Sequence, residues 1–446
     1  MTMQPGAPVE LGTEKIHRLL KQYAVPSIIA MGCSSLYNLV DSIFIGQLAG
    51  GYALAGLALT FPLMNLGTAF SSLIAVGASA NIGIFLGQKN WPMAQKVLGN
   101  VVTLNLIIGI LYMAGVLAFL DPILYFFGAS ADTISHAREY MQVILAGNMV
   151  SHTYFALNAV LRATGLPRQA MNASILTVLV NAAIDPLFIY WWGIRGAAIA
   201  TILAQGISLA WVISVLCNRS HVVHFQKGGY RLSGIIVKKI LSVGMSPFFM
   251  NATACLIVIV FNQGLKQYGG DMAIAAYGIV NKLTFLFIMV VMGLNQGMQP
   301  IASYNFGAKL YGRLQEVVKV TAISAIAVTT TGFLVAELFP TALVKMFTSD
   351  PALIDEAVHG LRISFIFYPI VGFQMVTSNF FRSIGYAGTA IFLSLTRQLI
   401  FLLPLLFILP EFFGLGGIWA SMPLADLIAC AVSASMMIYH LRKFRN

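Results

Sequence analysis

The polar residues with the clearest chemical meaning lie inside a long apolar stretch. Asn181, Asp185 and Pro186 fall within a run from about 171 to 192, and Asn181 and Asp185 are one helical turn apart, so they share a helix face. An aspartate at the centre of a bilayer costs about 2.5 to 3.5 kcal/mol, so it needs a partner or a wet cavity. Pro186 donates no backbone hydrogen bond and frees a carbonyl near Ala182. This combination predicts a cation or proton site; an aspartate paired for packing specificity is the alternative.

A second deep carboxylate belongs to the first apolar run. Asp41 ends a polar stripe in which Ser34, Tyr37 and Asn38 follow helical spacing. We therefore expect Asp41 to face the interior of the protein.

The candidate coupling site combines Asp41, Asn181 and Asp185, with further oxygens expected from Asn158 and Thr201. Carboxylate, amide and hydroxyl oxygens suit hard cations, so Na⁺ is one candidate ion. A proton is the other, because two neighbouring carboxylates titrate as a unit. The residues leave the choice between Na⁺ and H⁺ open.

Polar and flexible side chains elsewhere are candidates for a substrate cavity. Met-rich surfaces adapt to varied ligands, although lipid contact or helix packing explains many such residues equally well. Lys282 and Arg397 also lie within apolar runs; Lys282 is expected to pair or to extend toward the interface, and Arg397 to form an ion pair or meet an anionic substrate. The candidate cavity residues are Tyr37, Asn38, Gln205, Asn262, Met292, Gln296 and Gln299.

The elements that must position these residues are membrane-spanning helices. Of the 446 residues, 58% are hydrophobic and 9% charged, against about 25% charged in soluble domains. The apolar runs are near the length that a helix needs to cross a bilayer. We predict an all-α polytopic membrane protein with twelve spans, at about 24–47, 53–86, 98–120, 139–161, 171–192, 196–217, 241–265, 273–306, 318–339, 361–381, 388–410 and 416–440.

The net charge of +11 reflects topology and does not indicate nucleic-acid binding. Most of the 26 lysines and arginines fall in alternate inter-span segments, beginning with the N-terminal one. The positive-inside rule then predicts that both termini are cytoplasmic. The opposite segments hold only Arg138, Arg195, Lys266, Lys345 and Arg362.

The second half of the chain repeats the first. At a shift of 220 positions, Ala53 matches Ala273, Gly77 matches Gly297, and Arg162 matches Arg382. Because six spans separate the copies, the repeats have parallel topology, typical of two lobes around a central cavity. We predict an ion-coupling N-terminal six-helix lobe at 1–217, a cytoplasmic connection at 218–239 and a C-terminal six-helix lobe at 240–446. The deep carboxylates belong to the first lobe, and Asp426 is placed nearer the end of its span.

Catalytic and metal motifs do not occur in the sequence. There is no Walker A motif, nucleophile elbow or H-E-x-x-H pattern, so we expect neither an enzyme nor a cofactor. His221 and His224 alone are a weak metal signal. The four cysteines are scattered and predict no disulfide framework.

Several of these motifs resemble the multidrug and toxic compound extrusion (MATE) family. The resemblance lies in Asn38–Gly46, Arg162–Gly165, Asn181–Pro186, Gly293–Gly297 and Pro300–Gly307, and it covers nearly the whole chain. It implies two six-helix lobes and export of bulky, often cationic drugs in exchange for Na⁺ or protons. It also implies roles for Asp41, Asn181 and Asp185, with Asn158, Ala197 and Thr201 nearby. Some members carry an acidic residue where this chain has Gln296.

The expected protein is therefore a secondary antiporter, a monomer in a bacterial or archaeal inner membrane. Its partners would be the lipid bilayer and small drug-like molecules. A lipid-linked saccharide flippase of related architecture is the main alternative, although anionic lipid pyrophosphates would favour several deep arginines. A receptor or scaffold without transport is a third.

Overall fold

The computed structural model describes residues 8–49, 51–226 and 228–443, apart from the side chains of residues 36–40, 43 and 51. Throughout these residues the regular structure is helical, and no β-strand occurs among them. Helices suit this apolar chain because each satisfies its own backbone hydrogen bonds, which a bilayer cannot do. The predicted all-α membrane fold is confirmed.

The chain forms two compact units. Unit 1 holds the described residues up to Thr13 together with Ile29–Phe248, and unit 2 holds Glu14–Ile28 together with the chain from Phe249 onward. The predicted boundaries at 217 and 240 differ from this division, because the start of the first helix of each repeat belongs to the opposite unit.

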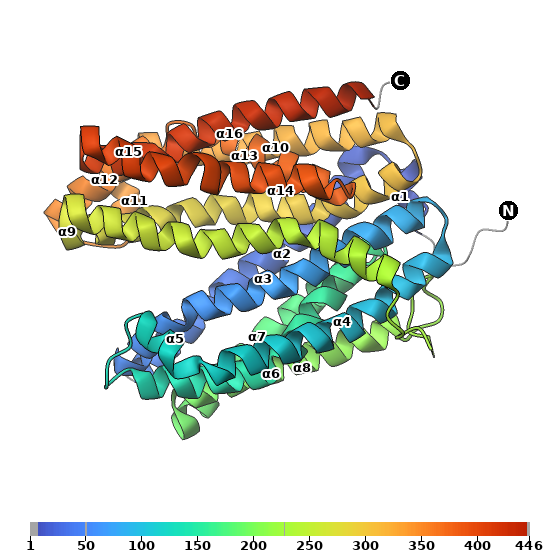
Figure 1. Ribbon diagram of the computed structural model, residues 1–446, viewed down its shortest axis with the longest axis horizontal. Coiled ribbons are helices and arrows are strands. Elements are labelled where there is room, and N and C mark those ends of the chain that lie inside the picture. The colour runs from blue at the N-terminus through green and yellow to red at the C-terminus, as the bar shows by residue number, and fades with distance from the viewer. Residues whose placement is uncertain (1–7, 50, 227, 444–446) are drawn as a thin grey trace. The chain divides into compact units, whose positions relative to one another are not determined.

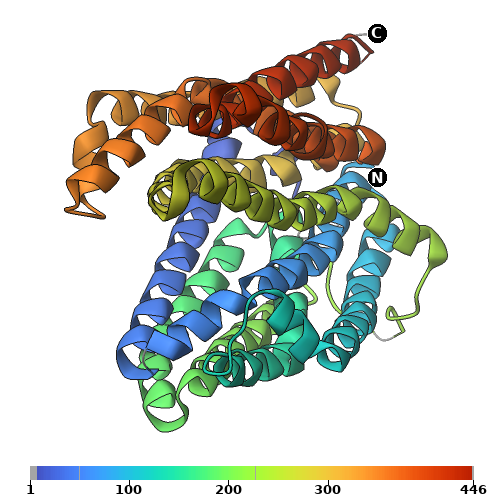
Figure 2. The ribbon, with the colours of Figure 1, turned by 60° about the vertical axis from the view of Figure 1, so that its left-hand side comes forward.

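Unit 1 is built around α6, which packs against α3, α4 and α8, while α7 packs against α8 (Figures 1 and 2). Gly193 joins α7 to α8 with a φ of 57°, a conformation that glycine adopts without strain. The elements are α1 (Glu10–Thr13), α2 (Ile16–Phe44), the π-helical η1 (Ile45–Ala49), α3 (Gly51–Gly87), α4 (Trp91–Ala118), α5 (Leu120–Phe126), α6 (Ile134–Ala163), α7 (Pro167–Trp192) and α8 (Ile194–Leu216).

Unit 2 follows the same plan with more interruptions. Gly270, at a φ of 67°, divides α9 into two helices, and α12 and α13 meet at a bend of 53°. The elements are α9 (Gly234–Gly307), α10 (Tyr311–Leu338), α11 (Pro340–Lys345), α12 (Pro351–Phe365), α13 (Tyr368–Ser383), α14 (Ala387–Leu395), the π-helical η2 (Thr396–Leu402), α15 (Leu403–Phe413) and α16 (Leu415–Lys443).

The described helices account for the twelve predicted spans. By length and hydropathy alone, eight of them could cross a membrane, or nine when the bent pair α12–α13 is one span. Dividing α9 at Gly270 and adding α2 and α6 gives twelve. The first helix begins before the predicted first span, because α2 runs unbroken from Ile16 through Pro26 to Phe44.

The start of the first helix of each repeat, which belongs to the opposite unit, packs against a glycine of that unit. The two glycines occupy equivalent positions in the repeat. In unit 2, Gly297 lies against the backbone of Ala24; in unit 1, Gly77 lies against the carbonyl of Ile240. A Cβ at either position would collide with backbone atoms. Close approach of two helices therefore explains why Gly77 and Gly297 match in the sequence.

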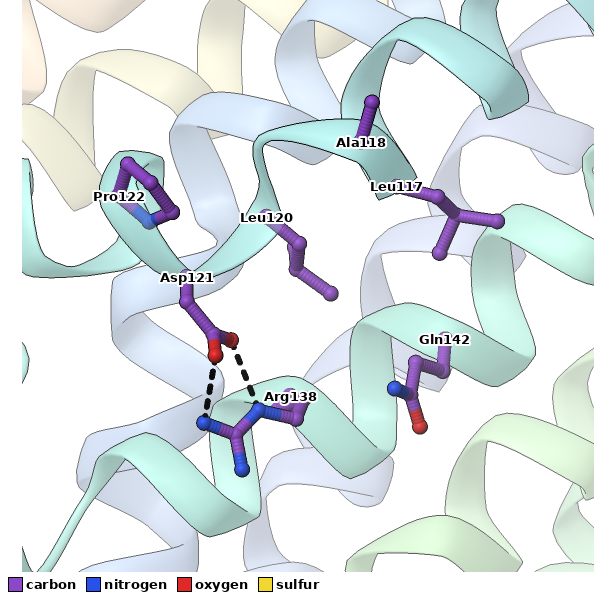
Figure 3. A pocket seen from close by; sticks show the side chains of 7 residues that line it. All are labelled: Leu117, Ala118, Leu120, Asp121, Pro122, Arg138 and Gln142. Atoms are coloured by element: carbon purple, nitrogen blue, oxygen red, sulfur yellow. Dashed lines mark hydrogen bonds and ion pairs between the residues drawn. The ribbon is translucent and has the colours of Figure 1, made fainter.

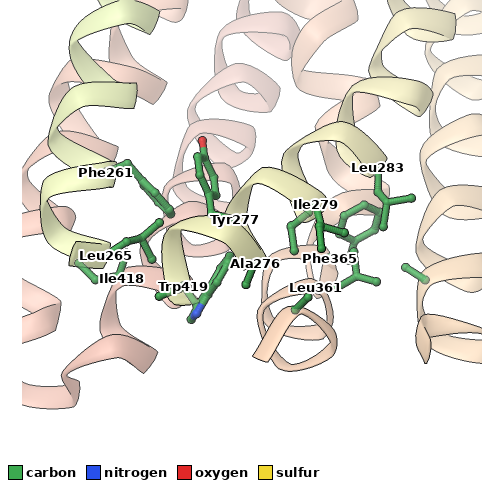
Figure 4. Packing of buried hydrophobic residues seen from close by; sticks show 14 of the residues in the cluster. Phe261, Leu265, Ala276, Tyr277, Ile279, Leu283, Leu361, Phe365, Ile418 and Trp419 are labelled. Carbon is green, nitrogen blue, oxygen red and sulfur yellow. The ribbon is translucent and has the colours of Figure 1, made fainter. Parts of the chain in front are cut away.

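Aromatic packing forms the core of unit 2 (Figure 4). Phe261 and Tyr277 have ring centroids 4.5 Å apart, and both pack near the indole of Trp419. The indole N–H donates to Glu356 Oε1 at 3.0 Å, which satisfies its polar atom. The two parts of α9 are thus held to α16 through one buried cluster.

The segment between α8 and α9 is fixed to α4 within unit 1. The Asn100 side chain accepts from the Ser233 N–H at 2.8 Å and donates to the Arg231 carbonyl at 3.2 Å. Gly99 lets the Gly229 carbonyl approach the helix backbone. This segment is therefore a packed strap rather than a free linker.

Candidate functional site

The carboxyl groups of Asp41 and Asp185 meet inside unit 1. Asp41 lies on α2 with 6% of its surface exposed, and Asp185 lies on α7 with none. The two groups are within interaction distance of each other. Among the described side chains, none donates a hydrogen bond to Asp41 Oδ1 or to either oxygen of Asp185. Two acceptor-only carboxylates in contact require a proton or a cation between them.

Apolar packing one turn beyond each aspartate brings the two helices together. Ile45 follows Asp41 by one turn, Ile189 follows Asp185 by one turn, and both isoleucines belong to one buried cluster with Ile194. Ile45 begins the π-helical η1, which contacts α7 and α8. Short π-helical segments occur frequently at functional sites, because they change the direction of side chains within a helix.

The amide of Asn181 lies one turn before Asp185 and contacts α8. Asn181 is 2% exposed, and its Nδ2 donates to Thr201 Oγ1 at 3.5 Å. Gln205, one turn after Thr201, accepts a hydrogen bond from Ser151 of α6. The structure therefore brings Asn181, Thr201 and Asp185 to the α7–α8 contact. Among the described residues no third His, Cys, Asp or Glu joins the two aspartates.

A cluster of hydroxyl groups continues from this site along α7. Thr177 Oγ1 bonds to Ser208 Oγ at 2.7 Å and to Tyr154 Oη at 3.0 Å. Tyr154 Oη in turn lies 3.5 Å from Ser174 Oγ. Thr177 precedes Asn181 by one helical turn and so shares its helix face, but the sequence gives no signal for Tyr154, because aromatic residues of a span usually contact lipid or pack.

Asn158 is not brought to the carboxylates. Its Nδ2 donates to the Ala170 carbonyl at 2.9 Å, and its Oδ1 accepts from Arg162. Ala170 and Asp185 lie on the same helix about 22 Å apart along its axis, at about 1.5 Å per residue. The amide of Asn158 is thus engaged at the other end of α7, too far from the aspartate pair to supply it with an oxygen in this structure.

The candidate substrate residues are divided between the two units. Gln205 belongs to unit 1, whereas Asn262, Met292, Gln296 and Gln299 belong to unit 2. Tyr37 and Asn38 lie on α2, but their side chains are outside the described residues. Their joint role in one cavity remains a prediction.

Unit 2 contains a deep ion pair between Arg397 and Asp426, two residues whose spacing in the sequence gives no sign of their contact. Arg397 Nε donates to Asp426 Oδ1 at 2.5 Å. Asp426 follows the start of α16 by about 16 Å, at about 1.5 Å per residue, so its expected place near the span end was wrong. Lys282 lies 6.0 Å from the centroid of the Phe347 ring, a cation–π contact.

A pocket of about 320 Å³ lies between the end of α4, α5 and the start of α6 (Figure 3). Arg138 donates through Nε and Nη2 to the two oxygens of Asp121 at 2.7 and 2.8 Å. This guanidinium holds the pKa of the Asp121 carboxyl below its usual value. None of the predicted coupling or cavity residues lines this pocket.

A family model for MatE matches residues 26–187 and 244–408, which include both aspartates of the pair. The chain belongs to the MatE family. It is therefore a multi-pass membrane transporter and not an enzyme, and the predicted resemblance is confirmed.

Relatives and solved structures of the MatE family extend over the whole chain. Multidrug export protein MepA of Staphylococcus haemolyticus is 24% identical over 429 residues, which cover 96% of this chain and 94% of that protein. The MATE multidrug transporter DinF-BH, solved in complex with R6G, has a TM-score of 0.90 and 32% identity, with 98% of each chain covered. An outward-facing multidrug resistance MATE family transporter has a TM-score of 0.93 at 24% identity, with both chains fully covered.

Proposed function

We propose that this MatE-family chain is an antiporter that exports bulky, often cationic organic compounds in exchange for Na⁺ or protons. The observation that carries the proposal is the contact between the buried carboxyl groups of Asp41 and Asp185, in which no other described side chain donates a hydrogen bond to Asp41 Oδ1 or to either oxygen of Asp185. Such a pair is stable only with a bound cation or proton, so it is suited to take up and release the coupling ion. Asn181 and Thr201 would complete the oxygen set.

Alternating access would convert ion binding into export. Ion binding to the pair disfavours the drug-loaded outward state, so an ion entering from outside exchanges for a drug leaving the cell. One charge moving through 100 mV supplies about 2.3 kcal/mol. That free energy sustains a substrate gradient of about fiftyfold, because about 1.4 kcal/mol corresponds to a factor of ten.

The proposed substrates follow from relatives and from the charge pattern. MepA is named a multidrug export protein, and DinF-BH was solved with R6G. The flippase alternative would use a free deep arginine for an anionic headgroup, but Arg397 already donates to Asp426. We place the protein as a monomer in the inner membrane with both termini cytoplasmic, and assign ion coupling to the N-terminal lobe, 1–217.

The direct test is transport in proteoliposomes. R6G efflux is measured under an imposed Na⁺ gradient and, separately, under an imposed pH gradient. We expect one gradient to drive efflux, and Asp185→Asn to abolish the driven component while the protein remains folded and inserted. Asp121→Asn, which changes a half-buried aspartate outside the site, serves as the matched control and should transport as the wild type does. Gradient-driven efflux retained in Asp185→Asn would refute the site.

A further inference from the structure

Hydrogen-bonding groups continue from the aspartate pair to the end of unit 1 where α6 meets α7. After the Tyr154 phenol, Ser174 Oγ donates to the Ala170 carbonyl at 3.2 Å. Asn158 Nδ2 donates to the same carbonyl at 2.9 Å, and Asn158 Oδ1 accepts from Arg162. The interior contact surface of α6, α7 and α8 is thus polar over much of its length.

One step of this line is open by a single helical turn. Thr177 and Asn181 lie on the same face of α7, four positions apart, where side chains are separated by about 5 to 6 Å. Ser208 and Thr201 lie on one face of α8, two turns apart. One water molecule spans a gap of this size between polar groups. The hydroxyl line, defined as Thr177, Ser208, Tyr154 and Ser174, therefore reaches the Asn181 amide through one water molecule, and Asp185 lies one further turn along α7.

Hydroxyl groups are chemically suited to passing protons. Each Ser, Thr or Tyr hydroxyl both donates and accepts a hydrogen bond, so a proton moves along a row of them as their O–H bonds reorient. The proton balance is simple, since each hydroxyl accepts one proton and releases another. A metal cation would instead need several oxygens at once and room to move. Left open at both ends, such a line would leak protons.

Arg162 lies at the end of this polar path where α6 meets α7, which is the inner end in the topology proposed above, and it is joined to Ser174 through Asn158 and the Ala170 carbonyl. It lies in the last turn of α6, is half-buried, and donates to Asn158. The Tyr154 phenol is close enough to interact with its charge. Among the described residues, no carboxylate forms a salt bridge with Arg162. A guanidinium has no acceptor lone pair and stays charged, so it neither accepts a proton nor lets one approach easily.

We propose that Arg162 is an electrostatic seal that closes the inner end of the hydroxyl line to protons. The seal confines ion exchange at Asp41 and Asp185 to the route that opens and closes with the substrate, so the two fluxes remain coupled. The proposed role of Arg162 in coupling rests on the proposed antiport function. The proton leak expected without Arg162 is measured in the absence of substrate, so its result is independent of whether drug export is observed.

The test is passive proton entry into proteoliposomes that hold a pH-sensitive dye, driven by a K⁺ diffusion potential and without substrate. Arg162→Gln should raise the protein-dependent proton flux at least about tenfold, which corresponds to lowering the barrier by about 1.4 kcal/mol. Arg162→Lys keeps the charge and should leave the flux low. Arg168→Gln, an exposed arginine at the start of α7, is the matched control and should also leave it low.

A second substitution separates the seal from a loss of packing. Adding Tyr154→Phe or Thr177→Val to Arg162→Gln removes a hydroxyl from the line and should return the flux toward the wild-type value. A leak caused by a loosened fold would persist in the double variants. Unchanged flux in folded Arg162→Gln, or a leak that ignores Tyr154→Phe and Thr177→Val, overturns the proposal.

Discussion

Arg397 and Asp426 form an ion pair across 2.5 Å in the middle of unit 2, joining η2 to α16. Both side chains are largely buried, with 26% and 11% of their surfaces exposed. A buried pair that loses one partner leaves an uncompensated charge, which costs on the order of 3 to 5 kcal/mol, whereas replacing both with apolar residues is often neutral.

We therefore expect Arg397→Met and Asp426→Leu each to lower the thermal unfolding midpoint strongly, and the double variant to recover most of the loss. The midpoint is measured on protein purified in detergent. Additive losses in the double variant would contradict the assigned pairing, because additivity indicates that the two residues act independently.

Substituting alanine for the glycines that contact the start of the first helix of each repeat should lower the stability of the protein, whereas the same substitution at glycines facing open space should raise it. Gly77→Ala and Gly297→Ala place a Cβ against backbone atoms and should destabilise the protein by about 1 to 3 kcal/mol. Gly115→Ala and Gly278→Ala meet no atom within 4 Å and should stabilise their helices by up to about 1 kcal/mol. Unfolding midpoints of the four variants check the sign, and equal effects at all four positions would argue against the close helix contacts.

The strap between α8 and α9 offers a proteolysis test. Gly99→Val would collide with the Gly229 carbonyl and release the segment from α4, so trypsin should cut faster at Arg219 and Arg231. Gly115→Val, on an open face of the same helix, is the control and should leave the rate unchanged. If the cleavage rate of Gly99→Val equals that of the wild type, the strap is not held by this contact.

The Asp121–Arg138 pair predicts a pH dependence at the pocket end of unit 1. Because Arg138 lowers the pKa of Asp121, the pair stabilises the folded state above the usual carboxyl range, and this contribution is lost as the pH falls through the lowered pKa. The difference in unfolding midpoint between wild type and Asp121→Asn should therefore be present at neutral pH and shrink in acid. A difference that grows in acid would contradict the lowered pKa.

Helical periodicity accounts for the parts of the fold and of the candidate site that could be predicted from the sequence. The spacing of Asn181 and Asp185 fixes their shared helix face, and the lengths of the apolar runs fix the twelve spans. Which residues of neighbouring helices lie level is harder to infer, because it depends on how the helices pack. Asn158 was grouped with aspartates from which it is well separated, since the end of α6 lies beside the start of α7. Asp426 was placed too near a span end, although it lies about 16 Å along α16. Tyr154 resembles any aromatic residue of a span until its hydroxyl is seen on Thr177.

The most direct test of the central claim is equilibrium binding of R6G to purified protein across separate Na⁺ and pH titrations. If the Asp41–Asp185 pair holds the coupling ion, one titration should weaken binding by a factor within the usual range of about 5 to 150. Asp41→Asn and Asp185→Asn should bind R6G with an affinity independent of both ions, and Asp121→Asn should follow the wild type. Undiminished ion dependence in Asp185→Asn would show that the coupling ion binds elsewhere.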